Sequence, residues 1–211
     1  MNALSIARGR RALLGMLRGP LRGGVIVLLT CGLLACGPGA PPFASTDITG
    51  ASFGRDFALS DHHGQRRTLA DFRGRAVVIF FGYTHCPDVC PTAMERFNQV
   101  LQRMGSDAAR VQVLFVTLDP ERDTRETLAK YVPFFNPGFL GLVGTVDEVA
   151  ATAKEFRVYY SKRTATGAGG YTVDHWAGAY AFDPAGRLRL YIAPETPIDA
   201  VAGDLRRLVA N

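Results

Sequence analysis

Two cysteines, Cys86 and Cys90, have the residue type and spacing that most directly suggest chemistry in this 211-residue sequence. They follow a continuous apolar run at 76–81, which predicts a strand buried on both faces. Apolar residues at helical spacing over 91–104 predict a helix that directly follows the second cysteine. The N-terminal end of a helix favours a thiolate over a thiol, so this position predicts a reactive or metal-binding pair.

The three residues between the cysteines bear on which chemistry is expected. Thiol–disulfide oxidoreductases usually have two intervening residues, whereas side chains four positions apart on a helical turn have Cβ atoms ~5–6 Å apart. A disulfide prefers Cβ atoms near ~3.8 Å. The wider spacing favours two thiolates that bind one metal ion, with Cu(I) the first choice and Zn(II) the next. A disulfide stays possible if the loop flexes.

A third ligand is expected at His175, which directly precedes a predicted strand. Two thiolates and one imidazole suit three-coordinate Cu(I), whereas a structural zinc site normally has four ligands. The alternative for His175 is a hydrogen-bonded loop histidine. His85 competes as a ligand because it adjoins the first cysteine, and His62 and His63 lie in a predicted hairpin turn where solvent is expected to surround them.

The remaining pattern predicts a thioredoxin-like α/β fold, with a central mixed sheet flanked by helices and an N-terminal β-hairpin, in one domain over 51–211. Alternating and continuous apolar runs predict the strands, and apolar stripes at helical spacing predict the helices. The expected elements are a hairpin at 53–74, strands at 76–81 and 111–117, helices at 91–104, 124–135 (broken at Pro133) and 147–157, a hairpin at 180–192, and a closing helix at 197–208.

The N-terminal segment predicts export and a lipid anchor. A basic stretch precedes an apolar run at 25–35, which is shorter than the ~20 residues that a membrane-spanning helix needs. Leu33-Leu-Ala-Cys-Gly37 resembles a bacterial lipobox, so we expect a lipoprotein signal peptide at 1–35, a lipidated Cys36, and a linker at 36–50. An ordinary cleaved signal or an uncleaved short anchor is the alternative. The domain would lie on the periplasmic face of a bacterial membrane.

The basic charge of the chain belongs to this segment and not to the domain. The formal net charge is +5, and residues 1–36 contain five arginines and no acidic residue. Without that segment the remainder is neutral, and no cluster of basic and aromatic residues follows. The composition therefore argues against a nucleic-acid partner.

Three segments of the sequence together resemble the Sco/SenC family of copper chaperones for oxidase assembly. They are Gly82-Tyr-Thr-His-Cys-Pro-Asp-Val-Cys-Pro91, Val116-Thr-Leu-Asp-Pro-Glu-Arg-Asp-Thr124 and Tyr171-Thr-Val-Asp-His175. The resemblance implies a thioredoxin-like fold and a copper ion, as Cu(I) or also Cu(II), bound by Cys86, Cys90 and His175.

The same resemblance implies partners and a supporting residue. The copper would pass to the binuclear copper centre of cytochrome c oxidase subunit II, with a copper donor chaperone and a thiol reductant as further partners. Asp119 would support the site from outside the ligand set, although a role in capping a loop or helix fits it equally well.

Two other functions use the same cysteines. A thiol–disulfide reductase would use one thiol to attack and the other to resolve, and it would not require His175. A peroxidase of the peroxiredoxin type would need Pro-x-x-x-Thr/Ser-x-x-Cys, but Ile79 and Tyr83 occupy those positions before Cys86. A metallochaperone, and not a conventional enzyme, is therefore the first hypothesis, with the reductase second.

Overall fold

The computed structural model describes residues 42–164 and 170–210. The predicted signal peptide at 1–35 and the predicted lipidation site Cys36 lie outside these residues. The elements run in the order β1 (Thr46–Asp47), β2 (Leu59–Asp61), β3 (Arg66–Arg67), the 3-10 helix η2 (Leu69–Phe72), β4 (Ala76–Gly82), α2 (Val89–Met104), the 3-10 helix η3 (Gly105–Arg110), β5 (Val111–Thr117), α3 (Arg125–Phe135), β6 (Leu140–Val143), α4 (Val146–Glu155), β7 (Tyr160–Thr164), β8 (Tyr171–His175), β9 (Ala179–Phe182), β10 (Leu188–Ile192) and α5 (Ile198–Ala210).

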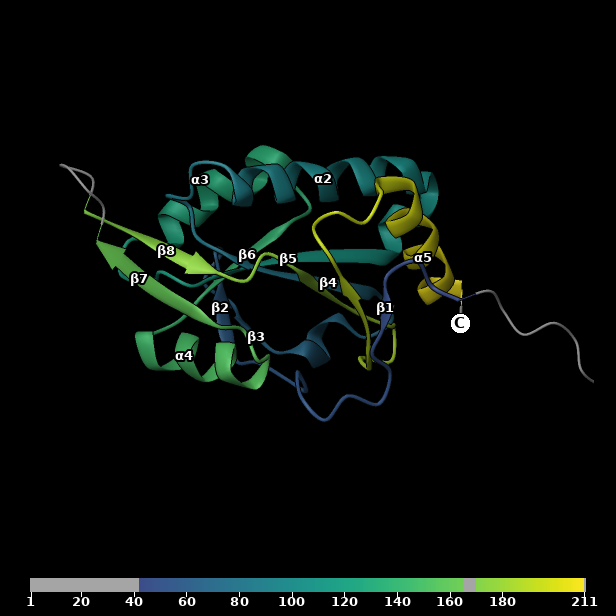
Figure 1. Cartoon of the computed structure of the whole chain (residues 1–211), viewed down its shortest axis with the longest axis horizontal. Coiled ribbons are helices and arrows are strands. Elements are labelled where there is room, and N and C mark those ends of the chain that lie inside the picture. The colour runs from purple at the N-terminus through teal and green to yellow at the C-terminus, as the bar shows by residue number, and fades with distance from the viewer. Residues whose placement is uncertain (1–41, 165–169, 211) are drawn as a thin grey trace, which may run out of the picture. The chain divides into compact units, whose positions relative to one another are not determined.

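A mixed eight-stranded sheet forms the centre of the domain, with strand order β1-β10-β9-β4-β5-β6-β2-β3. Strand β4 pairs in parallel with β5 and antiparallel with β9. Every residue of β4 and β5 is buried, as their continuous apolar sequence predicts. Helices α2 and α3 lie on one side of the sheet and α4 on the other (Figure 1). The predicted mixed sheet flanked by helices is confirmed, as is a hairpin formed by β2 and β3.

Two features of the elements differ from the prediction. Helix α3 does not break at Pro133 but continues to Phe135, so the proline lies in the last turn and the helix ends two residues after it. Strands β7 and β8 form a separate two-stranded sheet that the sequence did not predict. This hairpin extends from the left-hand end of the molecule in Figure 1, and its second strand ends at His175.

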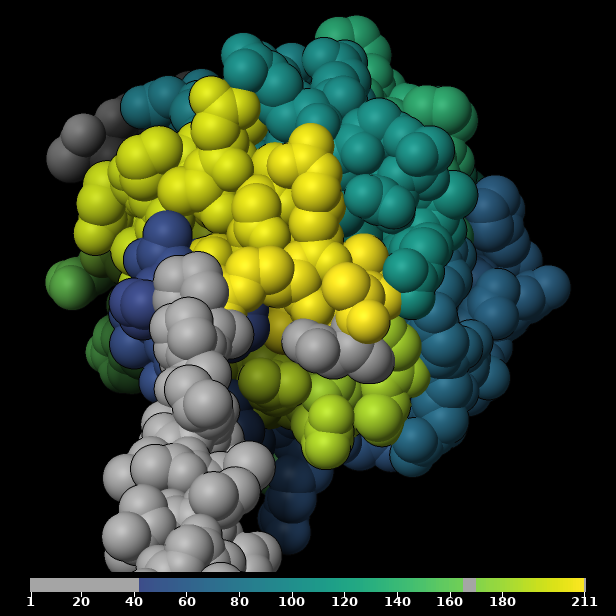
Figure 2. Space-filling model, turned by 90° about the vertical axis from the view of Figure 1, so that its right-hand side faces the viewer, coloured from purple at the N-terminus to yellow at the C-terminus, as the bar shows by residue number. Residues whose placement is uncertain are grey.

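The chain is already packed within the stretch predicted as a linker. The backbone N–H groups of Ala44 and Ser45 donate to the Asp204 carboxylate at 3.1 and 2.7 Å, and β1 pairs with β10. Figure 2 looks onto this end of the domain, where the yellow surface of α5 lies beside the purple-blue residues that begin the domain. None of the helices in the described ranges has the length and apolar character needed to cross a membrane.

Candidate metal centre

The side chains of Cys86, Cys90 and His175 converge at the end of β4. Their sulfur and nitrogen ligand atoms all lie within 4.8 Å of one another. Cys90 Sγ is 3.3 Å from His175 Nε2. Cys90 is fully buried, whereas Cys86 and His175 are partly exposed. The fold therefore brings together the three residues that the sequence singled out, although 85 positions separate the second cysteine from the histidine.

The two cysteines do not share a helical turn, and that part of the prediction was wrong. Helix α2 begins at Val89, so Cys90 lies in its first turn and Cys86 lies in the turn before it. Pro87 accounts for the difference, because a residue that precedes proline is sterically disfavoured from the helical region. The Cys86 sulfur still accepts the backbone N–H of Cys90 at 3.4 Å. The turn that carries Cys86 and the first turn of α2, which carries Cys90, thus bring the two sulfurs to the same site.

A backbone contact sets which nitrogen of His175 faces the sulfurs. His175 Nδ1 lies 2.9 Å from the carbonyl oxygen of Trp176, and since a carbonyl only accepts, Nδ1 carries the proton. Nε2 is then the ring nitrogen that faces Cys90 Sγ. The rings of Tyr83 and Phe80 meet the imidazole edge-on, with centroids 6.0 and 6.2 Å away. This orientation by a second hydrogen bond is typical of metal-binding histidines.

Burial and hydrogen bonding shift the pKa values of the two thiols in opposite directions. The hydrogen bond from the Cys90 thiol, followed by contacts from His175 and the backbone N–H groups of Asp88 and Cys90, lowers the pKa of Cys86 to about 3 against the opposing effect of burial. The pKa of Cys90 is raised, because it donates to the Cys86 sulfur and because it is buried. At neutral pH the pair therefore holds one proton and one negative charge, and a bound cation would displace that remaining proton.

His85 lies beside the cysteine loop but outside the ligand cluster. Its side chain is 53% exposed, and Nδ1 lies 3.1 Å from Thr84 Oγ1 and 3.8 Å from the Asp123 carboxylate. Among the residues that the structure describes, only the two cysteines and His175 form a group of three or more metal-ligand side chains. The competing assignment of His85 as the third ligand has no geometric support.

The histidines of the β2–β3 turn divide into one exposed and one buried residue. His63 is exposed, as predicted. His62 is buried, and its Nδ1 accepts the backbone N–H of Gly141 at 3.0 Å, so its prediction as a solvated residue was wrong. Burial, with a smaller effect from neighbouring His63, lowers the pKa of His62. The pairing of β2 with β6 explains this burial, because it places the turn beside Gly141.

Asp119 lies outside the ligand cluster and contacts the strand that carries His175. Its buried carboxylate accepts the Tyr171 hydroxyl at 2.6 Å and the Arg122 guanidinium. Arg122 also donates to the Tyr171 carbonyl at 3.0 Å, and Tyr171 begins β8, the strand that ends at His175. Helix α3 is capped by the side chain of Thr124 instead. The Asp119 carboxylate, with Arg122, thus holds the first residue of β8, the strand that ends at His175, by hydrogen bonds.

Asp123 is a buried residue near the centre that the sequence pattern alone does not single out. Its carboxylate accepts hydrogen bonds from Thr84 and Thr117. The sequence offers one signal for a role at the site: Asp123 stands four residues after Asp119, in a loop that follows a buried strand. Acidic residues in such loops are commonly solvated, and the sequence does not show which donors surround them.

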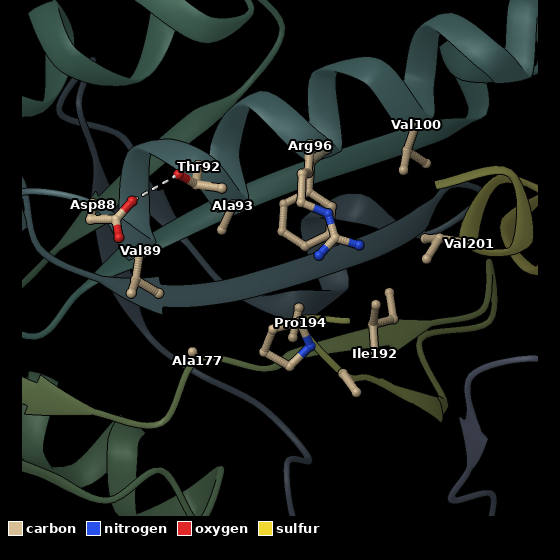
Figure 3. A pocket seen from close by; sticks show the side chains of 13 residues that line it. Asp88, Val89, Thr92, Ala93, Arg96, Val100, Ala177, Ile192, Pro194 and Val201 are labelled. Atoms are coloured by element: carbon tan, nitrogen blue, oxygen red, sulfur yellow. Dashed lines mark hydrogen bonds between the residues drawn. The ribbon is translucent and has the colours of Figure 1, made fainter. Parts of the chain in front are cut away.

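An apolar groove with a volume of about 240 Å³ runs along α2 beside the centre. Asp88 and Val89, which lie between the two cysteines, form one end of it, and Val100 and Val201 lie toward the other (Figure 3). Ala177, two residues after His175, forms part of its wall. The segments that carry the ligands therefore also border an apolar surface.

A mixed sheet flanked by helices, with paired thiols where the central strand meets a helix, defines a thioredoxin-like protein with a Cys₂His centre. The SCO1/SenC family profile matches residues 45–210, and the chain belongs to this family. The mitochondrial SCO2 homologue of Mus musculus is 40% identical over 157 residues, which are 74% of this chain and 62% of that protein. The chain thus spans about three fifths of that relative.

Solved structures show the same fold. The structure of Bradyrhizobium japonicum ScoI with copper bound is 40% identical, has a TM-score of 0.69, and matches 74% of this chain and 99% of that chain. Apo Sco1 from Thermus thermophilus is 38% identical, with a TM-score of 0.70, and matches 79% of this chain and 97% of that chain. The predicted thioredoxin-like fold and the predicted family are confirmed.

Proposed function

We propose that this protein is a copper metallochaperone. It binds one copper ion through Cys86, Cys90 and His175 and delivers it to the binuclear copper centre of cytochrome c oxidase subunit II. The observation that carries the proposal is the convergence of two sulfurs and one imidazole nitrogen within 4.8 Å. A family member with the same fold, Bradyrhizobium japonicum ScoI, has been solved with copper bound.

The donor set suits copper as a transferable cargo. Two soft thiolates and one imidazole favour Cu(I), with Cu(II) as the alternative state, whereas a structural zinc site would need a fourth ligand that the cluster does not supply in the described ranges. The partial exposure of Cys86 leaves one side of the centre open to a donor or an acceptor protein. An ion with three ligands can then be taken over by the ligands of a partner.

The second candidate function is reduction of the cysteines of the oxidase copper centre. The lowered pKa and partial exposure of Cys86 suit an attacking thiolate, and buried Cys90 suits the resolving thiol. Cys86 would form a mixed disulfide with an oxidised partner, and Cys90 would displace the reduced partner as the Cys86–Cys90 disulfide forms. A separate thiol reductant would regenerate the pair, and copper binding also requires the reduced pair.

Copper titration of the protein in its two redox states tests the proposed function. We expect the reduced protein to bind one Cu(I) per chain and the protein oxidised to the Cys86–Cys90 disulfide to bind none, because only thiolates provide the sulfur donors. Metal analysis after gel filtration measures the stoichiometry. A reduced protein that retains no copper but rapidly reduces a disulfide-containing subunit II fragment would favour the second candidate.

Asp119 supports the site in this proposal without binding the metal. Its hydrogen bond to Tyr171 and its ion pair with Arg122 fix the start of the strand that presents His175. Second-layer contacts of this kind orient metal ligands.

The protein acts at the periplasmic face of a bacterial membrane in this proposal, anchored through lipid on Cys36. The resemblance of residues 33–37 to a lipobox and the short apolar run at 25–35 support this location. A copper donor chaperone would load the site there. We expect the full-length chain in the membrane fraction and a Cys36→Ala chain to lose its lipid label.

A further inference from the structure

The loop that joins β5 to α3, residues 118–124, contacts both segments that carry the ligands: the strand that ends at His175 and the loop before Cys86. Asp119 contacts β8, the strand that ends at His175, as described above. We propose that Asp123 is the positioning residue for the cysteine loop, so that one short loop sets the distance between the thiols and the imidazole. This inference rests on the proposed copper site and assigns to it a residue that does not bind the metal.

The Asp123 carboxylate has no solvent exposure and accepts three hydrogen bonds. One oxygen accepts the backbone N–H of Thr84 at 2.9 Å and the Thr117 hydroxyl at 2.7 Å. The other oxygen accepts the Thr84 hydroxyl at 2.6 Å. Hydrogen bonds to a buried carboxylate are about twice as strong as those between neutral groups, so this cluster fixes its partners firmly.

The partners of Asp123 connect the cysteine loop to the sheet. Thr84 lies two residues before Cys86, and Thr117 is the last residue of β5. Beside them, the backbone N–H of Leu118 donates to the Gly82 carbonyl at 2.7 Å. Between Gly82 and the start of α2 the chain forms only turns. The Asp123 carboxylate therefore supplies a rigid attachment for a segment that has no strand or helix of its own.

The geometry separates positioning from metal binding. Asp123 is not part of the three-residue ligand cluster, and its two oxygens are occupied by threonine donors. It therefore acts on the copper through the placement of Cys86. Loss of the carboxylate would free Thr84 and the turn that follows it, while the fold of the sheet is kept by its own ladders.

Substitution of Asp123 tests this role. We expect Asp123→Ala to lower the Cu(I) affinity of the reduced protein about 10–100-fold, as loss of second-layer contacts typically does. We also expect it to shift the sulfur-to-copper charge-transfer band of the Cu(II) form. Thr84→Val, which removes one of the three donors, should have a smaller effect in the same direction, and Thr84→Ser should lose less than Thr84→Val.

Asp183 provides the matched control, because it is also a buried aspartate that binds loop N–H groups. It accepts from the backbone of Ala185 and Arg187 in the β9–β10 turn, away from the ligand cluster. Asp183→Ala should lower the melting temperature without changing copper affinity or the charge-transfer band. Equal losses of affinity in Asp123→Ala and Asp183→Ala would overturn the proposal.

A measurement on the metal-free protein separates this inference from the copper assignment. A loosened cysteine loop exposes the second sulfur, so we expect alkylation of Cys90 at pH 8 to be faster in both Asp123→Ala and Thr84→Val than in the unaltered protein, by at least about tenfold in Asp123→Ala. Because the Asp123 charge also raises the pKa of Cys90, Thr84→Val, which keeps that charge, isolates the positioning role. Peptide mass spectrometry measures the rate at each cysteine. An unchanged rate in a folded Asp123→Ala or Thr84→Val variant would refute the positioning role, whether or not the protein binds copper.

Discussion

Replacement of His175 by alanine is expected to lower the Cu(I) affinity of the reduced protein by at least about a hundredfold. Loss of groups that merely orient a ligand costs about 10–100-fold, so loss of a ligand itself should cost no less. Within the described ranges no other side chain is placed to take over, because the neighbouring His85 is outside the cluster and lies near Thr84 and Asp123. Competition with a chromophoric Cu(I) chelator measures the affinity.

Two other histidines serve as controls for this experiment. His63→Ala removes an exposed imidazole remote from the cluster, and His85→Ala removes the one beside the cysteine loop. Both variants should retain most of the affinity, whereas a Cys86→Ala/Cys90→Ala double variant defines the level of binding without thiolates. An affinity in His175→Ala equal to that of the unaltered protein would remove the imidazole from the ligand set.

Alkylation of Cys86 in the metal-free protein is expected to change little in rate between pH 5 and pH 8. Its pKa is lowered to about 3, chiefly by the hydrogen bond from Cys90. The reactive thiolate is therefore already formed at pH 5. An ordinary cysteine, with a pKa near 8.5, gains roughly a thousandfold in thiolate over the same interval. Iodoacetamide labelling followed by peptide mass spectrometry gives the rate at each sulfur.

The unfolded chain is the control for this pH profile. In denaturant, the hydrogen bonds to Cys86 are lost, and both cysteines should show the steep rise of a free thiol. In the folded protein, Cys90 should stay unmodified across the range, because its pKa is raised and its side chain is buried. A tenfold increase in the Cys86 rate per pH unit in the folded protein would contradict the lowered pKa.

The fold and the ligand set could be predicted from the sequence because each leaves a local signal. The apolar runs of β4 and β5 predict buried strands, and the cysteines follow β4 directly. Functional groups in such α/β folds gather at the carboxyl ends of the strands. His175 stands before an apolar run in the sequence, and the segments that resemble the Sco/SenC family associate it with the cysteines; β8, the strand that it ends, leaves no such signal.

What the sequence could not predict depends on contacts between distant segments. Strand β7 is mostly exposed and polar, so it lacks the apolar alternation that predicts a strand. Asp123 and His62 are polar residues in or beside turns, and their burial depends on partners elsewhere in the chain, at Thr84 and Gly141. Local composition predicts that polar residues in turns are exposed, and it does not indicate which of them are buried by distant partners.

Gly82 illustrates the same limit at the centre itself. A Cβ at this position would lie 2.8 Å from Cys90 Sγ and 2.9 and 3.0 Å from the rings of Phe80 and Phe115. Glycine at the end of a strand suggests a turn, but here it provides room for a sulfur atom. Only the packed structure distinguishes these two reasons for a glycine.

The unequal burial of the two sulfurs has a consequence for how an ion would leave. Cys90 is enclosed by the core, whereas Cys86 reaches the surface. An incoming donor atom from another protein can approach on the side of the partly exposed Cys86 and His175 but not past Cys90, so we expect an associative, one-sided substitution in which Cys90 dissociates last. Cys90 would be the last sulfur of this protein to release the ion, and the ion would pass directly to the ligands of the partner without becoming hydrated.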